Sequence, residues 1–287
     1  MYNYTRQIPL ILYIIIFSEE YKMKKILALV LSLIMVCSCA SVAFADGGVL
    51  DSIKAAGKLV VATEATYPPY EYLDDDANFA GCDIWLSQQI ADALGVELEI
   101  QDMGFDGIIE AVKTNLVDIG IAAFTRTDER AEVIDFSDLY ETSAQLLIVK
   151  AGNAETYSTK ESMAGKKVGA QMGTVQSQLV ESALSDSELF ELPTYPELAL
   201  ETVNDNIVGF VVDSAVGLAM VASSDGALEV SSFEFTAEEA SFGKACVIAK
   251  GNEDFVAAVN EVIAKVTEDG SYQAAYDAAV EASGSEG

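Results

Sequence analysis

The chain has 287 residues, of which 16 are basic and 46 acidic, so its formal net charge is −30; it contains no histidine. The charge argues against nucleic acid or anionic membrane surfaces as partners, because both need lysine and arginine to neutralise phosphate. The lack of histidine excludes Ser-His-Asp and Cys-His nucleophiles, a histidine base and histidine-ligated metal. Because the net charge makes copies of the chain repel one another, we expect a soluble monomer.

The cysteines also argue against a metal site. Cys37 and Cys39 lie in an apolar run without metal-ligand spacing, and Cys82 and Cys246 stand far apart in the sequence. We therefore expect neither a metal nor a cofactor. Sequence spacing alone does not show whether Cys82 and Cys246 pair, and we favour two buried free thiols.

The segment 23–45, "MKKILALVLSLIMVCSCASVAFA", has the pattern of a secretory signal peptide. Two lysines precede an apolar stretch too short to be a membrane span, and a small-x-small site ends at Ala45. A lipid anchor at Cys39 is the alternative to cleavage after Ala45. The segment after Cys39 is a poor polar tether, so we favour cleavage and an exported protein, in the periplasm or at the outer face of the cytoplasmic membrane. Residues 1–22 do not fit this pattern, and we interpret them as a mis-annotated leader.

The rest of the sequence alternates helical and strand patterns. Apolar runs of four to nine residues alternate with amphipathic stretches, which predicts α/β units around largely parallel sheets. The order of helix, turn, apolar strand and polar residue occurs twice, around residues 107–125 and 198–215. This similarity predicts two lobes. The expected helices are 49–56, 83–94, 105–115, 173–184, 196–206 and two within 252–282, and the expected strands are 58–63, 96–103, 116–124, 143–152, 166–171 and 207–213.

Ligands of α/β sheets bind beyond the carboxyl ends of the strands, so the polar residues that follow each apolar run are candidates. Arg130 follows the apolar run 116–124 and has the shape to hold a carboxylate in a bidentate fork. Alternatively, Arg130 is a solvated helix-start residue paired with Asp128 or Glu132. Thr125 offers a hydroxyl at the same strand end, or serves as an ordinary N-cap.

Two further candidates belong to the second predicted lobe. The stretch Gly173–Gln176 opens a helix, where unbonded backbone N–H groups suit a carboxylate oxygen; a simple glycine turn is the alternative. Asp213 ends a very apolar strand. It either accepts hydrogen bonds from an ammonium group or caps the helix that begins at Ser214, and the sequence favours neither.

Taken together, these groups suit an α-amino acid. Arg130 and the helix end offer a carboxylate site, while Asp213 and Glu64 offer an ammonium site. Tyr67, Tyr70 and Phe105 add aromatic walls.

Six stretches give the chain a closer resemblance. "VVATEATYPPYEY", "AGCDIWLSQQIADALG", "FDGIIEAV", "VDIGIAAFTRTDERAEVIDFSDLY", "KKVGAQMGT" and "DGSYQAAY" follow the order and spacing of the polar amino-acid-binding proteins of ABC importers, the family 3 extracellular solute-binding proteins. The resemblance runs from Leu50 to about Ala279. It implies a two-lobed, hinged periplasmic-binding-protein fold, in which each lobe is a mostly parallel sheet flanked by helices. It also implies a carrier, not an enzyme, that delivers a free amino acid to a membrane permease driven by a cytoplasmic ATPase.

The resemblance also implies lobe boundaries and residue roles. Lobe 1 would comprise 46–141 and 241–287, and lobe 2 would comprise 142–240. Arg130 would bind the ligand α-carboxylate with help from Thr125 and the backbone of Ala123, and Asp213 would hold the α-ammonium. The remaining implied contacts are the backbone N–H groups of Thr174 and Val175, the side chains of Tyr67 and Phe105 around the aliphatic part of the ligand, and Glu64 near its distal end.

The chain departs from the family pattern at several positions, which weakens any assignment of the ligand. Ala122-Ala123-Phe124 replaces a more usual glycine or serine pattern, Arg126 stands where an aliphatic residue is usual, and "NDNIVGFVVD" lacks the usual Gly and Asp before its strand. Glu64 favours a polar or cationic amino acid. The alternative functions on this fold are a dehydratase-type enzyme, with Glu64 or Asp213 as its acid or base, and a ligand-sensing module.

N-terminal sequencing of the exported protein tests the reading of the first 45 residues. We expect the mature chain to begin at Asp46, because the small-x-small site ends at Ala45. Recovery of peptides from 1–22 would contradict the leader interpretation, and a lipid-modified Cys39 would contradict cleavage after Ala45.

Overall fold

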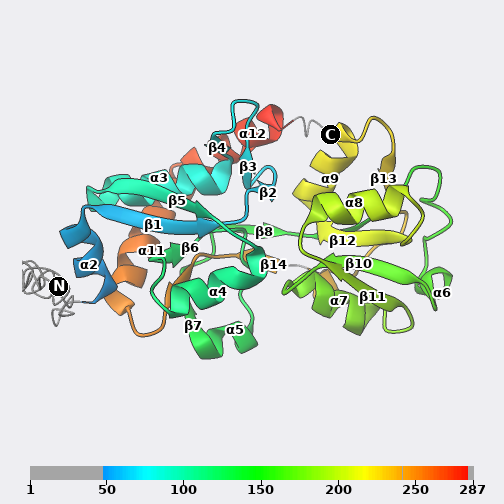
Figure 1. Ribbon diagram of the computed structural model, residues 1–287, viewed down its shortest axis with the longest axis horizontal. Helices are drawn as coiled ribbons and strands as arrows, with labels where there is room; N and C mark the ends of the chain where they lie inside the picture. Colours follow the sequence, from blue (N-terminus) through cyan, green and yellow to red (C-terminus); the bar gives the residue numbers. More distant parts are fainter. Residues whose placement is uncertain (1–47, 241, 284–287) are drawn as a thin grey trace, which may run out of the picture. The chain divides into compact units, whose positions relative to one another are not determined.

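The computed structural model describes residues 48–240 and 242–283. The predicted leader 1–22 and signal peptide 23–45, with Cys37 and Cys39, lie outside these residues. The described chain forms two five-stranded sheets in two lobes, and each sheet is flanked by helices (Figure 1). The predicted two-lobed α/β fold is therefore confirmed. In the part of the chain that the structure describes, no helix is both long and apolar enough to cross a membrane.

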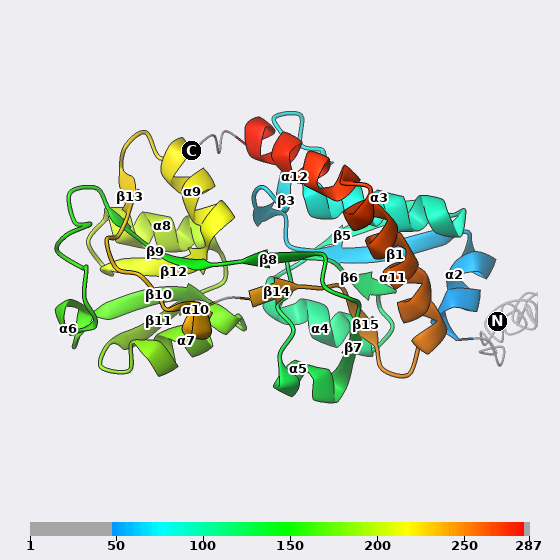
Figure 2. The same ribbon diagram turned by 180° about the vertical axis from the view of Figure 1, so that it is seen from behind.

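The sheet of lobe 1 has the order β5-β1-β6-β15-β7. Its strand β1 is apolar on both faces because helices cover both. Leu59 and Val61 belong to the core formed with α3 and α11, whereas Val60 and Ala62 pack with the side chains of α4. Figure 2 shows α11 and α12 running together along this lobe beside α3. The elements are α2 (Val49–Ala56), β1 (Lys58–Thr63), α3 (Cys82–Leu94), β5 (Glu97–Asp102), α4 (Phe105–Lys113), β6 (Ile119–Gly120), α5 (Asp128–Val133), β7 (Ile134–Phe136), β15 (Val247–Ala249), α11 (Glu253–Glu268) and α12 (Ser271–Ala282).

The sheet of lobe 2 has the order β11-β10-β12-β9-β13 and is built in the same way. Phe210 and Val212 pack on one face with side chains of α8 and α9, and Val211 packs on the other with those of α7. The elements are β9 (Gln145–Lys150), α6 (Lys160–Met163), β10 (Lys167–Gln171), α7 (Val175–Ala183), β11 (Glu188–Leu192), α8 (Tyr195–Val203), β12 (Gly209–Asp213), α9 (Ser214–Ser223), β13 (Leu228–Val230) and α10 (Ala237–Ala240).

Two short strands connect the lobes. β8 (Glu141–Ser143) and β14 (Phe242–Lys244) pair antiparallel, and we call them the hinge ribbon (Figure 1). β8 leads into β9 of lobe 2, and β14 leads into β15 of lobe 1. Both strands enter their sheets from the side where the lobes meet, so they run opposite to the strands that end there. Each sheet therefore has two parallel and two antiparallel pairings, and the expectation of mostly parallel sheets is corrected to mixed ones.

The expected strand 116–124 is much shorter in the structure. Only Ile119–Gly120 pair in the sheet, although the residues around them are buried. Ala123 has a left-handed φ of 47°. Its N–H binds the buried carboxylate of Asp83 at 2.7 Å instead of a neighbouring strand. The apolar run is therefore buried from Ile119 to Phe124, but it does not form an extended strand over that length.

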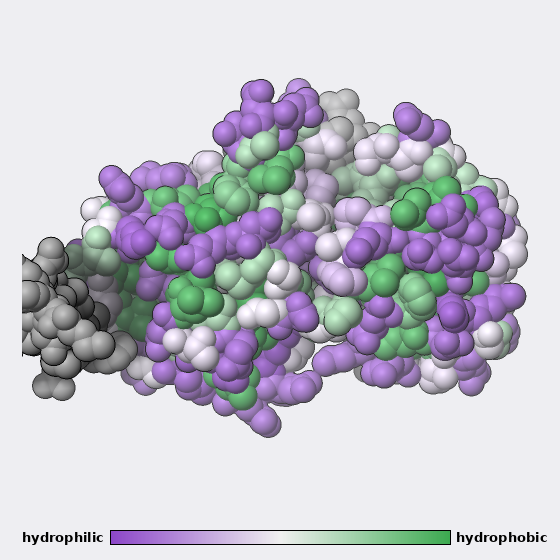
Figure 3. All heavy atoms as spheres, in the orientation of Figure 1, coloured by the Kyte–Doolittle hydropathy of each residue, from purple (hydrophilic) through white to green (hydrophobic). Residues whose placement is uncertain are grey.

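The stretch that follows β1 forms a small three-stranded sheet of β2 (Thr66–Tyr67), β3 (Glu71–Leu73) and β4 (Phe79–Ala80). Tyr70 is fully buried beneath it. Cys82 and Cys246 are buried free thiols, which confirms the reading that we favoured. The face drawn in Figure 3 is largely hydrophilic, with small separate hydrophobic patches.

Two leucines on α8 provide a matched test of the lobe 2 core. Leu198 is fully buried, whereas Leu200 is 60% exposed. Leu198→Ala should lower the free energy of unfolding by about 2–5 kcal/mol, because it removes buried apolar surface and leaves a cavity. Leu200→Ala should stay within about 0.5 kcal/mol of the unaltered protein. Urea unfolding measures both, and equal losses for the two variants would contradict this packing.

Candidate functional site

A cavity lies where the carboxyl ends of β1, β10 and β12 meet. Side chains from both lobes and from the hinge ribbon line it. Its position agrees with the general rule for open α/β sheets. All nine residues predicted from the sequence lie around it: Glu64, Tyr67, Phe105, Ala123, Thr125, Arg130, Thr174, Val175 and Asp213.

Arg130 lies on the first turn of α5, and its guanidinium stands beside a stacked pair of aromatic rings, Phe105 and Phe124, whose centroids are 4.5 Å apart. The guanidinium carbon is 5.7 Å from the centroid of the Phe105 ring and 5.5 Å from that of Phe124. Nη1 donates to the carbonyl oxygen of Thr125 at 2.6 Å, and Nη2 donates to that of Gly173, in lobe 2, at 2.8 Å. Burial lowers the pKa of Arg130 to about 10, so it remains a cation at neutral pH. Arg130 is therefore an oriented cation at the cavity rather than a solvated partner of nearby carboxylates.

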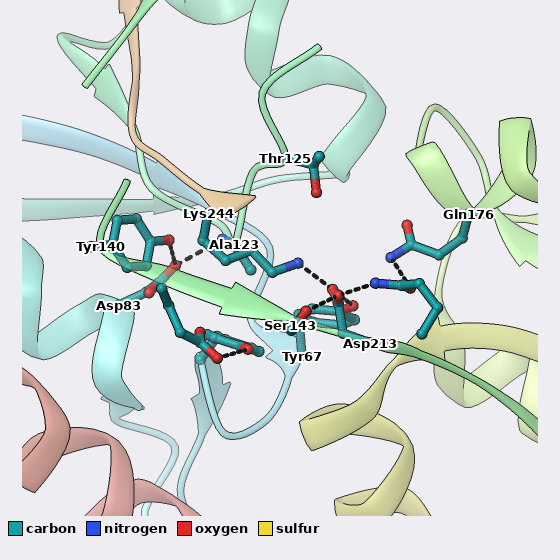
Figure 4. Close-up of polar contacts among 12 residues, drawn as sticks. Tyr67, Asp83, Ala123, Thr125, Tyr140, Ser143, Gln176, Asp213 and Lys244 are labelled. Atoms are coloured by element: carbon teal, nitrogen blue, oxygen red, sulfur yellow. Dashed lines mark hydrogen bonds and ion pairs between the residues drawn. The ribbon is translucent and has the colours of Figure 1, made fainter. Parts of the chain in front are cut away.

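The two threonines of the prediction have different local roles. Thr127, not Thr125, caps α5 and accepts a hydrogen bond from the N–H of Arg130. The N-cap alternative for Thr125 is therefore wrong, and Thr125, a buried residue, lines the cavity (Figure 4). Thr174 does cap its helix, because its Oγ1 accepts from the N–H of Ser177. Val175 is the first residue of α7, where helix N–H groups lack partners within the helix.

The preceding residue, Gly173, has a φ of +75°, which favours glycine, and a Cβ there would come within 3.2 Å of Asp106. The conformation of this turn therefore brings the start of α7 close to lobe 1.

Asp213 is the most heavily bonded acid of the site. Its Oδ2 accepts from the Tyr67 hydroxyl and the Lys244 ammonium, and its Oδ1 accepts from the Ser143 hydroxyl and, at 2.6 Å, from Nε2 of Gln145 (Figure 4). Burial would raise the pKa of Asp213, but Lys244 and these hydrogen bonds outweigh it, so the pKa lies below its usual range. Asp213 stands at the N-cap position of α9 without a side-chain cap hydrogen bond. The cap alternative for Asp213 is therefore wrong.

Glu64 and Gln171 meet across the lobes at another side of the cavity. Nε2 of Gln171 donates to Oε2 of Glu64 at 3.2 Å, and the Thr66 hydroxyl donates to Oε1. Burial raises the pKa of Glu64 to about 7. The aromatic wall beside them is formed by Tyr67, whose ring centroid is 5.2 Å from that of Tyr195 and 5.8 Å from that of Tyr70.

The sequence analysis missed several residues of the cavity, of which Lys244 matters most. Lys244 is 1% exposed and lies on the hinge ribbon, with its ammonium on Asp213. A lysine directly before the apolar run Ala245–Ala249 was the available signal, because lysine is rarely buried without a partner. Gln176 donates to Oε1 of Gln145 at 2.8 Å. The other missed lining residues are Glu71, Ala122 and Gln171.

Comparison with known proteins agrees with this fold and cavity. The chain belongs to the bacterial extracellular solute-binding proteins, family 3, whose pattern matches residues 59–281. The L-cystine-binding protein TcyJ of Escherichia coli (strain K12) is 31% identical over 245 residues, covering 85% of this chain and 91% of TcyJ.

Solved structures are similar over the same region. The amino acid ABC transporter substrate-binding protein AbpA of Streptococcus pneumoniae, bound to L-arginine, has a TM-score of 0.78 and 32% identity over 81% of this chain and 98% of its own. The ancestral amino acid-binding protein AncCDT-1, a precursor of cyclohexadienyl dehydratase, has a TM-score of 0.73 and 29% identity over 81% and 99%. The chain is thus similar both to binding proteins and to a forerunner of an enzyme.

The pKa of Glu64 gives the stability of the protein a predictable pH dependence. A carboxyl whose pKa is raised by folding, here from 4.5 to about 7, stabilises the folded state at low pH. That contribution is lost as the pH rises through this window, because the folded state must then hold a buried charge. At about pH 8, Glu64→Gln should therefore be more stable than the unaltered protein by up to about 3 kcal/mol, and this gain should shrink toward about pH 5.

Urea unfolding at the two pH values measures the gain. The exposed Glu97→Gln variant is the matched control. A gain for Glu64→Gln that is the same at both pH values would contradict the burial of a titrating carboxyl at this position.

Proposed function

We propose that this protein is an exported substrate-binding protein that captures a free L-amino acid between its two lobes and delivers it to an ABC permease with a cytoplasmic ATPase. The observation that carries the proposal is the pairing of two charged groups at one buried cavity. Arg130 of lobe 1 offers an oriented guanidinium for an α-carboxylate, and Asp213 of lobe 2 offers a carboxylate for an α-ammonium. A zwitterion needs both at once.

The rest of the cavity supports a polar or cationic side chain on the ligand. Three carboxyl side chains line it, those of Glu64, Glu71 and Asp213, against the two cations Arg130 and Lys244. Burial raises the pKa of Glu64 to about 7, and a positive side chain on the ligand would stabilise its ionised form. Glu64 and Gln171 would receive its distal group by hydrogen bonds, and Tyr67 and Phe105 would contact its aliphatic part. The arginine bound to the similar protein AbpA is consistent with this class of ligand.

In this proposal the lobes move as the units expected from the sequence, 46–141 with 241–287 and 142–240. Closure would take place about the hinge ribbon, as in other hinged binding proteins. The hydrogen bond from Arg130 to Gly173 joins the lobes at the cavity. A monomer is consistent with the net charge of −30.

A dehydratase-type enzyme is the second candidate, and two observations favour it. AncCDT-1 is named as a precursor of a dehydratase, and the raised pKa of Glu64 suits a general acid. Formation of product from candidate substrates would support the enzyme. Binding without turnover supports the carrier.

A thermal-shift screen of the twenty standard L-amino acids and L-cystine tests the proposed function. A ligand at about 100 times its Kd adds about 2.7 kcal/mol of stability, which raises the Tm of a domain of this size by about 5–10 °C. Arg130→Ala should abolish the shift, because no other cation would face the α-carboxylate from lobe 1. Asp213→Asn should weaken it by removing the charge that faces the ammonium.

Arg126→Ala is the matched control, since Arg126 is exposed on the same segment and does not line the cavity. It should retain the full shift. No shift with any of these compounds in the unaltered protein would refute the proposed function, and an unchanged shift in Arg130→Ala would refute the carboxylate assignment.

A further inference from the structure

The carboxylate of Asp213 has no acceptor position left for a ligand. A carboxylate offers about four lone-pair positions, two on each oxygen. Tyr67 and Lys244 donate to Oδ2, and Ser143 and Gln145 donate to Oδ1. A ligand ammonium that binds Asp213 must therefore replace one of these four donors.

Lys244 is the donor whose replacement conserves charge. The hydroxyls of Tyr67 and Ser143 and the amide of Gln145 are neutral, so replacing any of them would place two ammonium groups on one buried carboxylate. Such a site would carry an uncompensated buried charge, which is costly. The Lys244 side chain, in contrast, ends in a primary ammonium of the kind that an amino acid carries, and it lines the cavity itself.

A second partner for Lys244 stands directly opposite it on the hinge ribbon. Lys244 of β14 and Glu141 of β8 are register partners in this antiparallel pair. Directly opposed side chains lie on the same face of the ribbon, with Cβ atoms about 5 Å apart. A change of the Lys244 rotamer therefore brings its ammonium to the carboxyl of Glu141 without movement of the backbone.

Glu141 also has an acceptor to offer. Its Oε1 accepts from the Tyr70 hydroxyl at 2.9 Å, whereas its Oε2 is buried and has no hydrogen-bond partner among the described residues. The Lys244 ammonium lies 5.8 Å from the centroid of the same Tyr70 ring, so Tyr70 adjoins both groups. Burial raises the pKa of Glu141 to about 7. In such a buried environment a neighbouring ammonium stabilises the ionised carboxyl strongly.

Two other buried carboxyls, those of Asp83 and Glu71, also interact electrostatically with Lys244. Asp83 accepts from the N–H of Ala123 and, at 2.9 Å, from the Tyr140 hydroxyl (Figure 4). Oδ1 of Asp83 and Oε2 of Glu71 are buried without a hydrogen-bond partner among the described residues, as is Oε2 of Glu141. Of these three carboxyls, only that of Glu141 belongs to the hinge ribbon and stands directly opposite Lys244, so Glu141 is the destination that the register of the ribbon selects.

We propose that Lys244 is a displaceable occupant of the ammonium subsite: the α-ammonium of the ligand takes its place on Asp213, and Lys244 moves to Glu141. This inference rests on the proposed function. It assigns Glu141, which does not line the cavity, as a positioning residue for ligand recognition. It also makes the exchange specific for ligands that carry an amino group, because a ligand without one leaves Lys244 on Asp213.

Isothermal titration calorimetry with L-arginine and its amine-free counterpart, 5-guanidinopentanoic acid, tests the exchange. Glu141→Gln should weaken L-arginine by at least about tenfold, because the displaced lysine loses its anion. The same variant should leave 5-guanidinopentanoic acid within about twofold, since that probe displaces nothing. If L-arginine does not bind but another amino acid of the screen does, that amino acid and its amine-free acid serve as the pair.

A second substitution separates the exchange from a merely structural effect of Glu141. In a Lys244→Met background, where no lysine needs a new partner, Glu141→Gln should change the affinity for L-arginine by less than about twofold. Glu97→Gln is the control, on an exposed glutamate outside the hinge ribbon. Equal weakening of both probes by Glu141→Gln, or no weakening of either, would overturn the inference.

A crystal structure of the unaltered protein with L-arginine bound gives a direct answer that does not depend on the folding of any variant. The Lys244 ammonium should lie on the carboxyl of Glu141, with the ligand ammonium on Asp213. A lysine still bonded to Asp213 would overturn the exchange while leaving the proposed function standing, because L-arginine would nevertheless be bound. Failure of every amino acid to bind would instead refute the function itself.

Discussion

The buried ion pair between Lys244 and Asp213 connects the parts of this protein that matter for its site. Lys244 comes from the hinge ribbon and Asp213 from the end of β12 in lobe 2, and both are almost wholly excluded from water. Isolated, either charge would be very unfavourable at its position. They form a polar centre with three hydrogen-bond donors to Asp213: Tyr67 of lobe 1, Ser143 at the end of β8 and Gln145 at the start of β9. The two lobes and the hinge ribbon are thus joined at this point by an ion pair and its hydrogen bonds.

The mixed parallel and antiparallel pairing of both sheets follows from the two strands of the hinge ribbon. If all strands of a lobe were parallel, each would have its carboxyl end at the cavity. No strand would then lead the chain from the cavity into the sheet. β8 and β14 provide the two crossings, and the strands into which they lead are the ones that run antiparallel. The same crossings place Glu141 and Lys244 beside the ligand cavity. Architecture and site chemistry therefore depend on the same six residues of the ribbon.

The sequence predicted the two-lobed α/β fold and nine residues that line the cavity, but not the hydrogen-bond partners of those residues. Arg130, Thr174 and Asp213 follow strands or open helices, and these positions are visible in a pattern of apolar runs. The choice between ligand group and helix cap at Asp213 was not visible, because it depends on a hydroxyl and an amide far away in the chain. Lys244 was missed for a similar reason. Its partner is 31 residues distant, and only the pairing of β14 with β8 brings its side chain into the cavity.

The hydrogen bond from Arg130 to the carbonyl of Gly173 gives one side chain two functions. Its guanidinium links lobe 1 to the Gly173 carbonyl of lobe 2, and it also lines the cavity. In the hinge motion that we propose, separation of the lobes would break this charge-assisted hydrogen bond, so the guanidinium would be held less firmly in an open form. Closure of the lobes and orientation of the Arg130 guanidinium would then belong to one equilibrium, so a substitution of Gly173 or its neighbours that shifts one would shift the other.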